Sequence, residues 1–237
     1  MGRYPRQFNG CALLLTGLMV FLAVPHAGAE VILLRSGNGT VGGTDSLVNM
    51  LVGPANSPFG AAFTPADFTA ARTGPAAHII NNHAAWIAGL AGDPNSKWIG
   101  TNPGAVSEGA TALYAIDFAL TQPVLSATLD LHYSVDNLLG GGPNQGVFLN
   151  GTAISGSSTG GSFGSEFTLF RGDIGPLLSV GTNTLYINAS DVGGPGGLLF
   201  RAEINTVPVP EPSTLALFLL AIGSISGYGY YRRKRTA

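Results

Sequence analysis

The stretch PVLSATLDLHYSV, residues 123–135, decides the fold class of this chain. Its apolar side chains occupy every second position, and polar side chains stand between them. This period of two is typical of a strand that has one face in a core and the other face in solvent. The core face is predicted to carry Leu125, Ala127, Leu129, Leu131, Tyr133 and Val135.

Segments on both sides of this stretch repeat the pattern. Residues 110–120 and 197–204 alternate in the same way, and turn clusters rich in Gly, Pro, Asn and Asp separate them from shorter apolar runs. The pair Asn150-Gly151 is typical of a tight hairpin. Shorter strands are predicted at 31–35, 47–52, 77–80, 97–99, 146–150, 166–170 and 184–189.

Only one helix is predicted between these strands. Thr64 can cap it, Pro65 suits its first turn, and Asp67 complements the positive end of the helix dipole. About ten short strands without a strand–helix rhythm predict an all-β protein, an antiparallel β-sandwich or jelly roll. We assign residues 30–206 to this ectodomain.

The charge of the middle region restricts its partners. Residues 30–207 contain twelve acidic and five basic side chains, which gives a net charge of −7. An acidic domain repels nucleic acid and anionic headgroups but tolerates neutral glycans and cations. No nucleic-acid partner is therefore expected.

Residues 1–29 are predicted to be a secretory signal peptide. Arg3 and Arg6 precede an apolar run from Cys11 to Val24, and Ala27-Gly28-Ala29 supplies the small residues of a cleavage site. The run would make a helix of only about 21 Å, shorter than the hydrocarbon core of a membrane at roughly 30 Å. An uncleaved signal anchor is the alternative. Cys11 is the only cysteine, so the mature chain is predicted to fold without disulfides.

The uncharged residues 213–231 are predicted to form a transmembrane helix of about 28 Å. Four cations follow this span directly, and such clusters stay on the cytoplasmic side and stop transfer. Residues 232–237 are therefore predicted to be a basic cytoplasmic tail. The stop-transfer cations are Arg232, Arg233, Lys234 and Arg235.

The linker before this span, residues 207–212, contains Pro210-Glu211-Pro212. The proline-rich motif, the apolar span and the basic end together resemble the PEP-CTERM sorting signal of Gram-negative bacteria. The resemblance implies recognition by an exosortase-type enzyme, processing near Pro210–Pro212 and delivery to the cell surface or extracellular matrix. It also implies an organism that makes exopolysaccharide. A plain single-pass anchor is the alternative.

A second resemblance covers residues 86–204. The order of its short motifs is similar to that of galactose-binding-domain-like jelly rolls, a fold shared by many carbohydrate-binding modules. This resemblance implies a glycan-binding sandwich, but it carries over no set of sugar-clamping residues. The motifs are Trp98-Ile99, Tyr114-Ala115-Ile116-Asp117-Phe118, Ala127-Thr128-Leu129, Val135-Asp136-Asn137, Val147-Phe148-Leu149-Asn150-Gly151, Gly181-Thr182-Asn183-Thr184-Leu185 and Gly197-Leu198-Leu199.

Two glycine-rich loops, residues 135–146 and 188–197, each place an Asp before a Gly-Gly-Pro turn. Loops at one end of a sandwich commonly form a binding rim. Oxygens of Asp136, Asn137 and Asp191 suit calcium or sugar hydroxyls, so these three residues are the candidate ligand or calcium rim. The alternative is turn chemistry alone, because Asp and Asn stabilise turns without a ligand.

Catalytic patterns are not found in the sequence: it contains neither G-x-S-x-G nor H-E-x-x-H. Trp86 and Trp98 would stack on sugar rings if exposed, although burial is the commoner fate of tryptophan. We therefore predict a non-catalytic exported protein with no catalytic residue, in which polysaccharide is the candidate ligand. A purely structural surface protein and a secreted glycan-active enzyme remain the alternatives.

Overall fold

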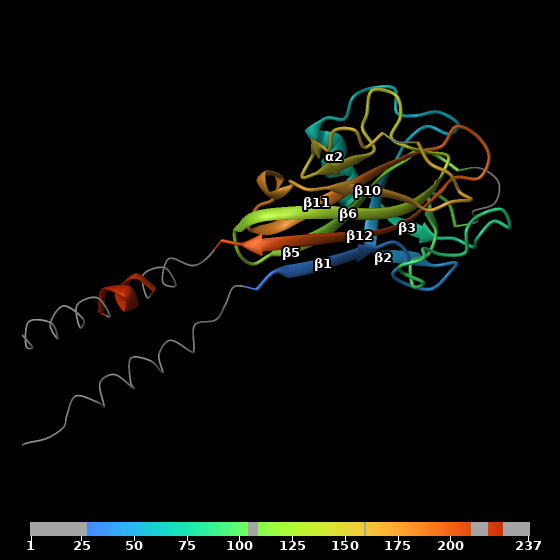
Figure 1. Ribbon diagram of the computed structural model, residues 1–237. Helices are drawn as coiled ribbons and strands as arrows, with labels where there is room; N and C mark the ends of the chain where they lie inside the picture. The colour runs from blue at the N-terminus through green and yellow to red at the C-terminus, as the bar shows by residue number, and fades with distance from the viewer. Residues whose placement is uncertain (1–27, 104–108, 159, 210–217, 225–237) are drawn as a thin grey trace, which may run out of the picture. The chain divides into compact units, whose positions relative to one another are not determined.

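Strands dominate the computed structural model, which describes residues 28–103, 109–158, 160–209 and 218–224 (Figure 1). Residues 29–208 form one compact unit. Its helical segments are α2 (Pro65–Thr73) and the 3-10 turn η2 (Gly175–Leu177). Its strands are β1 (Glu30–Arg35), β2 (Thr44–Val52), β3 (Ala76–Ile79), β4 (Ile99–Gly100), β5 (Ala112–Leu120), β6 (Val124–Asp136), β7 (Leu138–Leu139), β8 (Val147–Leu149), β9 (Thr152–Ala153), β10 (Phe167–Arg171), β11 (Gly181–Ser190) and β12 (Gly197–Pro208).

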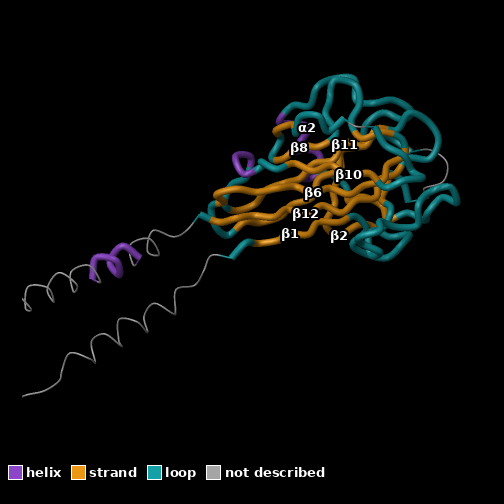
Figure 2. The backbone as a smooth tube through the Cα atoms, viewed as in Figure 1, coloured by secondary structure: helices purple, strands orange, loops and turns teal. Residues whose placement is uncertain are grey.

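The strands pair antiparallel in the order β10-β6-β12-β4-β3-β2-β5-β11-β8-β9, with β1 also on β12 and β7 on β11. The short β3 and β4 connect two broad regions, one built on β6 and β12 and the other on β5 and β11. Figure 2 shows the strands of this unit in orange and its loops in teal. Inward side chains of both regions, such as Leu131, Phe200, Ile116 and Ile187, belong to one apolar core. The predicted antiparallel β-sandwich is therefore confirmed.

The alternation of residues 123–135 matches β6 with one exception. Five of the six predicted core positions are buried, but Leu125 is 67% exposed. Near Leu125 the pairing with β12 is irregular: Ser126 lies opposite Val207, and Val124 lies opposite the next residue, Pro208. Leu125 is the extra residue of this bulge, and a bulge breaks the alternation of faces on which the prediction rested.

The second face of β5 is covered, which its alternation did not predict. Leu113 and Ala115 pack under α2 in a separate apolar cluster with Phe68. The predicted helix start is confirmed: Thr64 is the N-cap, Pro65 is the first helical residue, and the Asp67 carboxylate accepts hydrogen bonds from the backbone and hydroxyl of Thr64. This helix therefore adds a third layer over β5.

The two ends of the sandwich differ in what they carry. At one end, Glu30 of β1 lies opposite Thr206 of β12, so the chain enters and leaves the unit at the same place (Figure 1). At the other end β6 finishes at Asp136 and β12 begins at Gly197, paired with each other. We call this second end, with the loops that join its strands, the loop end.

The predicted terminal segments lie mainly outside the described residues. This holds for the signal peptide, for Pro210–Pro212, for the basic tail and for most of the span 213–231. Residues 218–224 are helical and bear exposed apolar side chains. Within the described part of the chain, no helix is long and apolar enough to cross a membrane.

Candidate functional site

Strand pairing brings two of the predicted rim residues together at the loop end. Asp136 is the last residue of β6 and lies opposite Gly197. Asp191 directly follows β11, whose Ser190 is paired with Leu138 just beyond Asp136. Asp136 and Asp191 are 5% and 1% exposed, and the negative charge of Asp191 contributes to the raised pKa of Asp136. The loop end thus buries two neighbouring carboxyl groups.

Two donors hold the Asp136 carboxylate. The Trp86 indole Nε1–H donates to Oδ2 at 2.9 Å, and the Asn137 amide donates to Oδ1 at 2.6 Å. Burial is the main cause that raises the pKa of Asp136; Asp191 raises it further, whereas the Trp86 bond and the nearby His83 lower it. The pKa of Asp136 therefore reflects two opposing effects: desolvation favours the protonated form, and the hydrogen bonds favour the anion.

The Asp191 carboxylate is less well satisfied. Its Oδ1 accepts the Gly193 backbone N–H at 3.0 Å, but its buried Oδ2 has no hydrogen-bond partner among the described residues. The same is true of Asn188 Oδ1 and Ser190 Oγ, at the end of the preceding strand. Since buried polar atoms are almost always paired, a run of three unpaired oxygens here needs an explanation.

Asn137 is placed at the rim, but its amide is already engaged. Its Nδ2 donates to Asp136, and its Oδ1 accepts the Val192 N–H at 2.8 Å. Asn137 therefore ties the β6 end to the loop that follows Asp191. Of the three predicted rim residues, only Asp191 has a buried carboxylate oxygen without a hydrogen-bond partner among the described residues.

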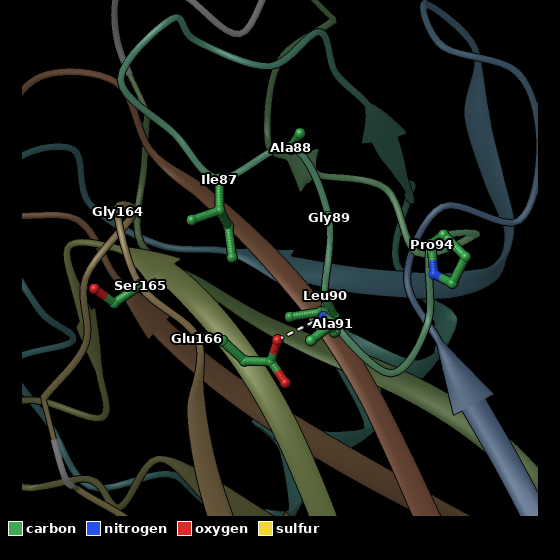
Figure 3. A pocket seen from close by; sticks show the side chains of 9 residues that line it. All are labelled: Ile87, Ala88, Gly89, Leu90, Ala91, Pro94, Gly164, Ser165 and Glu166. Carbon is green, nitrogen blue, oxygen red and sulfur yellow. Dashed lines mark hydrogen bonds between the residues drawn. The ribbon is translucent and has the colours of Figure 1, made fainter.

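A hollow of about 610 Å³ lies between the loop that joins β3 to β4 and the loop that leads into β10. Figure 3 shows the Glu166 carboxylate reaching across it to the loop that carries Ala91. Glu166 Oε2 accepts the Ala91 N–H at 2.7 Å, and Glu166 Oε1 lies 2.7 Å from His132 Nδ1. The lining residues are Ile87, Ala88, Gly89, Leu90, Ala91, Pro94, Gly164, Ser165 and Glu166.

Sequence reasoning missed the role of Glu166, since it stood only as the first residue of a predicted strand. Its partner His132 lies between Glu166 and Asp130, and the Asp130 Oδ1 is 3.5 Å from His132 Nε2. The only signal for Glu166 was an acid at the start of a strand, and only the pairing of β10 with β6 turns it toward His132.

Both tryptophans are buried at this end. Trp86 is 7% exposed and Trp98 is fully buried, with ring centroids 4.2 Å apart. A Cβ at Gly197 would come within 2.8 Å of the Trp86 ring, so that position needs glycine. Neither indole presents a free face on which a sugar could stack.

The described residues contain no group of three His, Cys, Asp or Glu side chains arranged to hold a metal. A site for zinc or another metal held by several such side chains is therefore not found in this part of the chain. Calcium differs, because backbone carbonyls, side-chain amides and water can complete its coordination shell.

The end of the chain matches a known family model over residues 208–235. The model describes the PEP-CTERM protein-sorting motif. This chain carries that motif. The match includes Pro210-Glu211-Pro212 and the basic run Arg232–Arg235 that the sequence analysis singled out. The PEP-CTERM motif marks an exported protein and implies processing by an exosortase.

No curated protein matches the chain. Among solved structures, it is similar to a family 35 carbohydrate binding module from Clostridium thermocellum, with 13% identity, coverage of 54% of this chain and 86% of that chain, and a TM-score of 0.31. It is also similar to CBM35 from Cellvibrio japonicus Abf62, with 12% identity, coverage of 76% and 100%, and a TM-score of 0.29. An exo-beta-1,3-galactanase from Phanerochaete chrysosporium matches at 13% identity over 54% of this chain and 26% of that chain, with a TM-score of 0.27.

Proposed function

We propose that this PEP-CTERM protein is a non-catalytic component of the cell surface or extracellular matrix that binds glycan at its loop end. The sorting motif at residues 208–235 carries the export half of this proposal. The terminal span anchors the protein transiently until an exosortase-type enzyme processes the chain near Pro210–Pro212. The signal peptide directs the chain through the inner membrane first.

The arrangement of the two ends supports a role in display. The chain joins its terminal segments at the end where Glu30 meets Thr206, and the hollow lies among the loops at the other end. A domain tethered at one end presents its opposite loops to the surroundings, where loops commonly carry binding function. This is the geometry expected of a surface protein that contacts an extracellular polymer.

The hollow is the observation that carries glycan binding. Its volume of about 610 Å³ lies within the usual range for small-ligand sites, roughly 300–1,000 Å³. Ile87 and Pro94 offer apolar surface to the C–H face of a sugar, and Ser165 together with backbone groups offers hydrogen bonds to its hydroxyls. Because the domain is acidic, a neutral glycan is favoured over an anionic one.

A purely structural surface protein is the second candidate, and the tryptophans favour it. Exposed indoles are the usual platform for sugar rings, but Trp86 and Trp98 stack on each other inside the fold. The test must therefore separate a domain that binds glycan without tryptophan from one that binds none.

Binding of the purified protein to an array of neutral and acidic polysaccharides is the first test. A Gly89→Arg variant fills the hollow without local strain, because a Cβ at this position meets only Pro94, at 4.0 Å. We expect it to weaken binding of a neutral glycan at least about tenfold. Gly60→Arg is the matched control, since a Cβ there meets no atom within 4 Å and Gly60 does not line the hollow. No binding to any glycan would favour the structural candidate, and equal binding by both variants would mean that the glycan binds outside the hollow.

Export is tested separately by intact mass. The expected species in the culture medium or outer membrane begins near Glu30 and ends near Pro210–Pro212. A chain that keeps Arg232–Arg235 and stays in the inner membrane would mean that the C-terminal segment is a plain anchor.

A further inference from the structure

We propose that strand β1 is an interaction edge through which two copies of this chain pair antiparallel, with Ile32 of one copy opposite Ile32 of the other. This pairing joins the sheets of the two domains into one continuous sheet. It does not depend on the proposed glycan binding and would be present in a purely structural surface protein as well.

The side of β1 that faces away from β12 is the first argument. Among the described residues, β1 pairs with β12 alone, from Glu30 opposite Thr206 to Arg35 opposite Arg201. Figure 1 shows β1 at the margin of the sheet beside β12. An edge strand presents a row of backbone N–H and C=O groups that can form hydrogen bonds with a further strand.

The other strands at the ends of the sheet order are less open to such pairing. β7 and β9 have only two residues each. β10 has five, and its last residue, Arg171, donates hydrogen bonds to the carbonyls of Ser155 and Gly156 at 3.0 and 2.9 Å, which holds the preceding loop against the end of that strand. β1 has six residues, and its middle four, Val31–Leu34, contain none of the charges or prolines with which natural sheets protect their edges.

The exposed apolar side chains of β1 are the second argument. Val31 and Leu33 are 59% and 43% exposed, whereas Leu34, on the opposite face, is buried in the core. Their partners in β12 are the polar residues Asn205 and Glu203, so no apolar neighbour on that strand covers them. A strand added at this edge would bury both side chains.

The positions of these side chains favour a second copy of this chain as the added strand. If Ile32 lies opposite Ile32 of the second copy, then Val31 lies opposite Leu33 of that copy, and Leu33 lies opposite its Val31. Residues directly opposite each other share one face of an antiparallel pair, so all four exposed side chains meet on the outer face. A two-fold axis generates this self-complementary contact, and two-fold dimers are the commonest oligomers.

The charges at the two ends of β1 favour the antiparallel direction. Glu30 begins the strand and Arg35 ends it, so antiparallel copies bring each Glu30 near the Arg35 of the other copy. Parallel copies would instead bring like charges together, which is unfavourable. Arg35 Nη1 lies 3.2 Å from Asp93 Oδ1, but 27% of the Arg35 side chain is exposed, and a guanidinium has five N–H donors for more than one carboxylate.

The mass of the full chain in detergent, measured by light scattering over a range of concentrations, tests self-association. We expect the dimer fraction to rise with concentration. Leu33→Lys places a charge on the edge and should lower the dimer fraction at least about fivefold. Leu125→Lys is the matched control, because Leu125 is 67% exposed on β6, which β12 separates from β1. The control should leave the dimer fraction unchanged.

Disulfide cross-linking tests the register without adding a charge. Every variant carries Cys11→Ser, because Cys11 is the only cysteine of the chain. An equal mixture of Val31→Cys chains and Leu33→Cys chains places the two new thiols opposite each other, close enough to form a disulfide. This mixture should cross-link at least about tenfold faster than either variant alone or than Leu125→Cys, because only directly opposite residues reach the required separation.

The proposal is overturned if the full chain is monomeric at every concentration. It is also overturned if Leu33→Lys and Leu125→Lys dimerise equally, since another surface or the terminal span would then hold the copies together. Cross-linking of the mixture no faster than that of Leu125→Cys would overturn it even if Leu33→Lys did not fold. Failure of glycan binding alone would leave the β1 pairing standing, because no glycan enters these experiments.

Discussion

The domain buries carboxylates in two regions, the turn around Asp45 and the rim of Asp136 and Asp191, and it treats them differently. Asp45 accepts hydrogen bonds on both oxygens from nearby backbone, including Gly37 N at 2.6 Å and Leu47 N at 2.9 Å. At the rim, Asp136 accepts hydrogen bonds from its neighbour Asn137 and from Trp86, fifty positions away in the chain, and one Asp191 oxygen has no donor among the described residues.

The difference separates a buried acid whose charge the fold satisfies fully from a pair that it satisfies only in part. The donors to Asp45 lie within eight residues of it, so a local turn satisfies that charge completely. The rim is assembled from strand ends that are distant in sequence, and its oxygens are satisfied only in part. A charge that the fold leaves unsatisfied is the better candidate for binding.

Asp45→Ala should give the largest effect. The change leaves several buried backbone N–H groups without an acceptor, so the free energy of unfolding should fall by about 3–5 kcal/mol. Urea denaturation followed by tryptophan fluorescence measures it. Asp173→Ala, at an exposed position, is the control and should change stability by less than about 0.5 kcal/mol. A loss below about 1 kcal/mol for Asp45→Ala would erase the contrast between the two regions.

Trp86→Phe should give the next largest effect. It keeps an aromatic ring but removes the donor to Asp136 Oδ2 and part of the packing on Trp98, at a cost of about 2 kcal/mol. Trp98→Phe is the matched control, because its indole donates to the Ile87 carbonyl at 2.9 Å and not to a carboxylate. Both variants should lose stability, but only Trp86→Phe should also change how stability depends on pH, because the Trp86 bond lowers the pKa of Asp136. Equal pH profiles would mean that the Trp86 bond does not stabilise the Asp136 anion.

Asp191→Asn should act in the opposite direction to a change at Asp45. It removes a charged oxygen that has no partner among the described residues and relieves repulsion on Asp136, so stability at neutral pH should stay equal or rise by up to about 1 kcal/mol. Denaturation at pH 7 measures this. A loss of more than about 1 kcal/mol would show that Asp191 serves the fold as Asp45 does.

The pH profile of the same variant checks the cause. The pKa of Asp136 is raised in the folded protein above its ordinary value of 3.8, so its contribution to stability is present below that value and is lost as pH rises through the folded pKa. Asp191→Asn removes one source of the raised pKa. Its stability relative to the unaltered protein should therefore increase between about pH 4 and pH 7. A difference that does not change with pH would exclude coupling between the two carboxylates.

Arg72→Gln removes the partner of Asp117, a carboxylate outside both regions, and should have the smallest effect on stability. Arg72 pairs with Asp117 at 2.9 Å, but both side chains are exposed by more than two fifths. Water already solvates such a pair, so the loss should be about 0.2–0.5 kcal/mol and should shrink in high salt. Denaturation in low and high salt measures it. A loss comparable with that of Asp45→Ala would contradict the view that burial separates these carboxylates.

The sequence by itself determined most of the local structure and the destination of the chain. Period-two alternation identified β5, β6 and β12, and the Thr64–Asp67 pattern identified the start of α2, because each depends on side chains only a few positions apart. The PEP-CTERM motif is likewise a linear signal that an enzyme reads along the chain. Its match at residues 208–235 required no folded domain.

Only the tertiary structure decided how the loop end is built. The sequence named Asp136, Asn137 and Asp191, but the pairing of β6 with β12 and of β11 with β7 decides that the two carboxylates meet and that the amide braces them. It also buries both tryptophans and turns Glu166 toward His132. These features depend on which strands become neighbours, and strand pairing over tens of residues leaves no local period in the sequence.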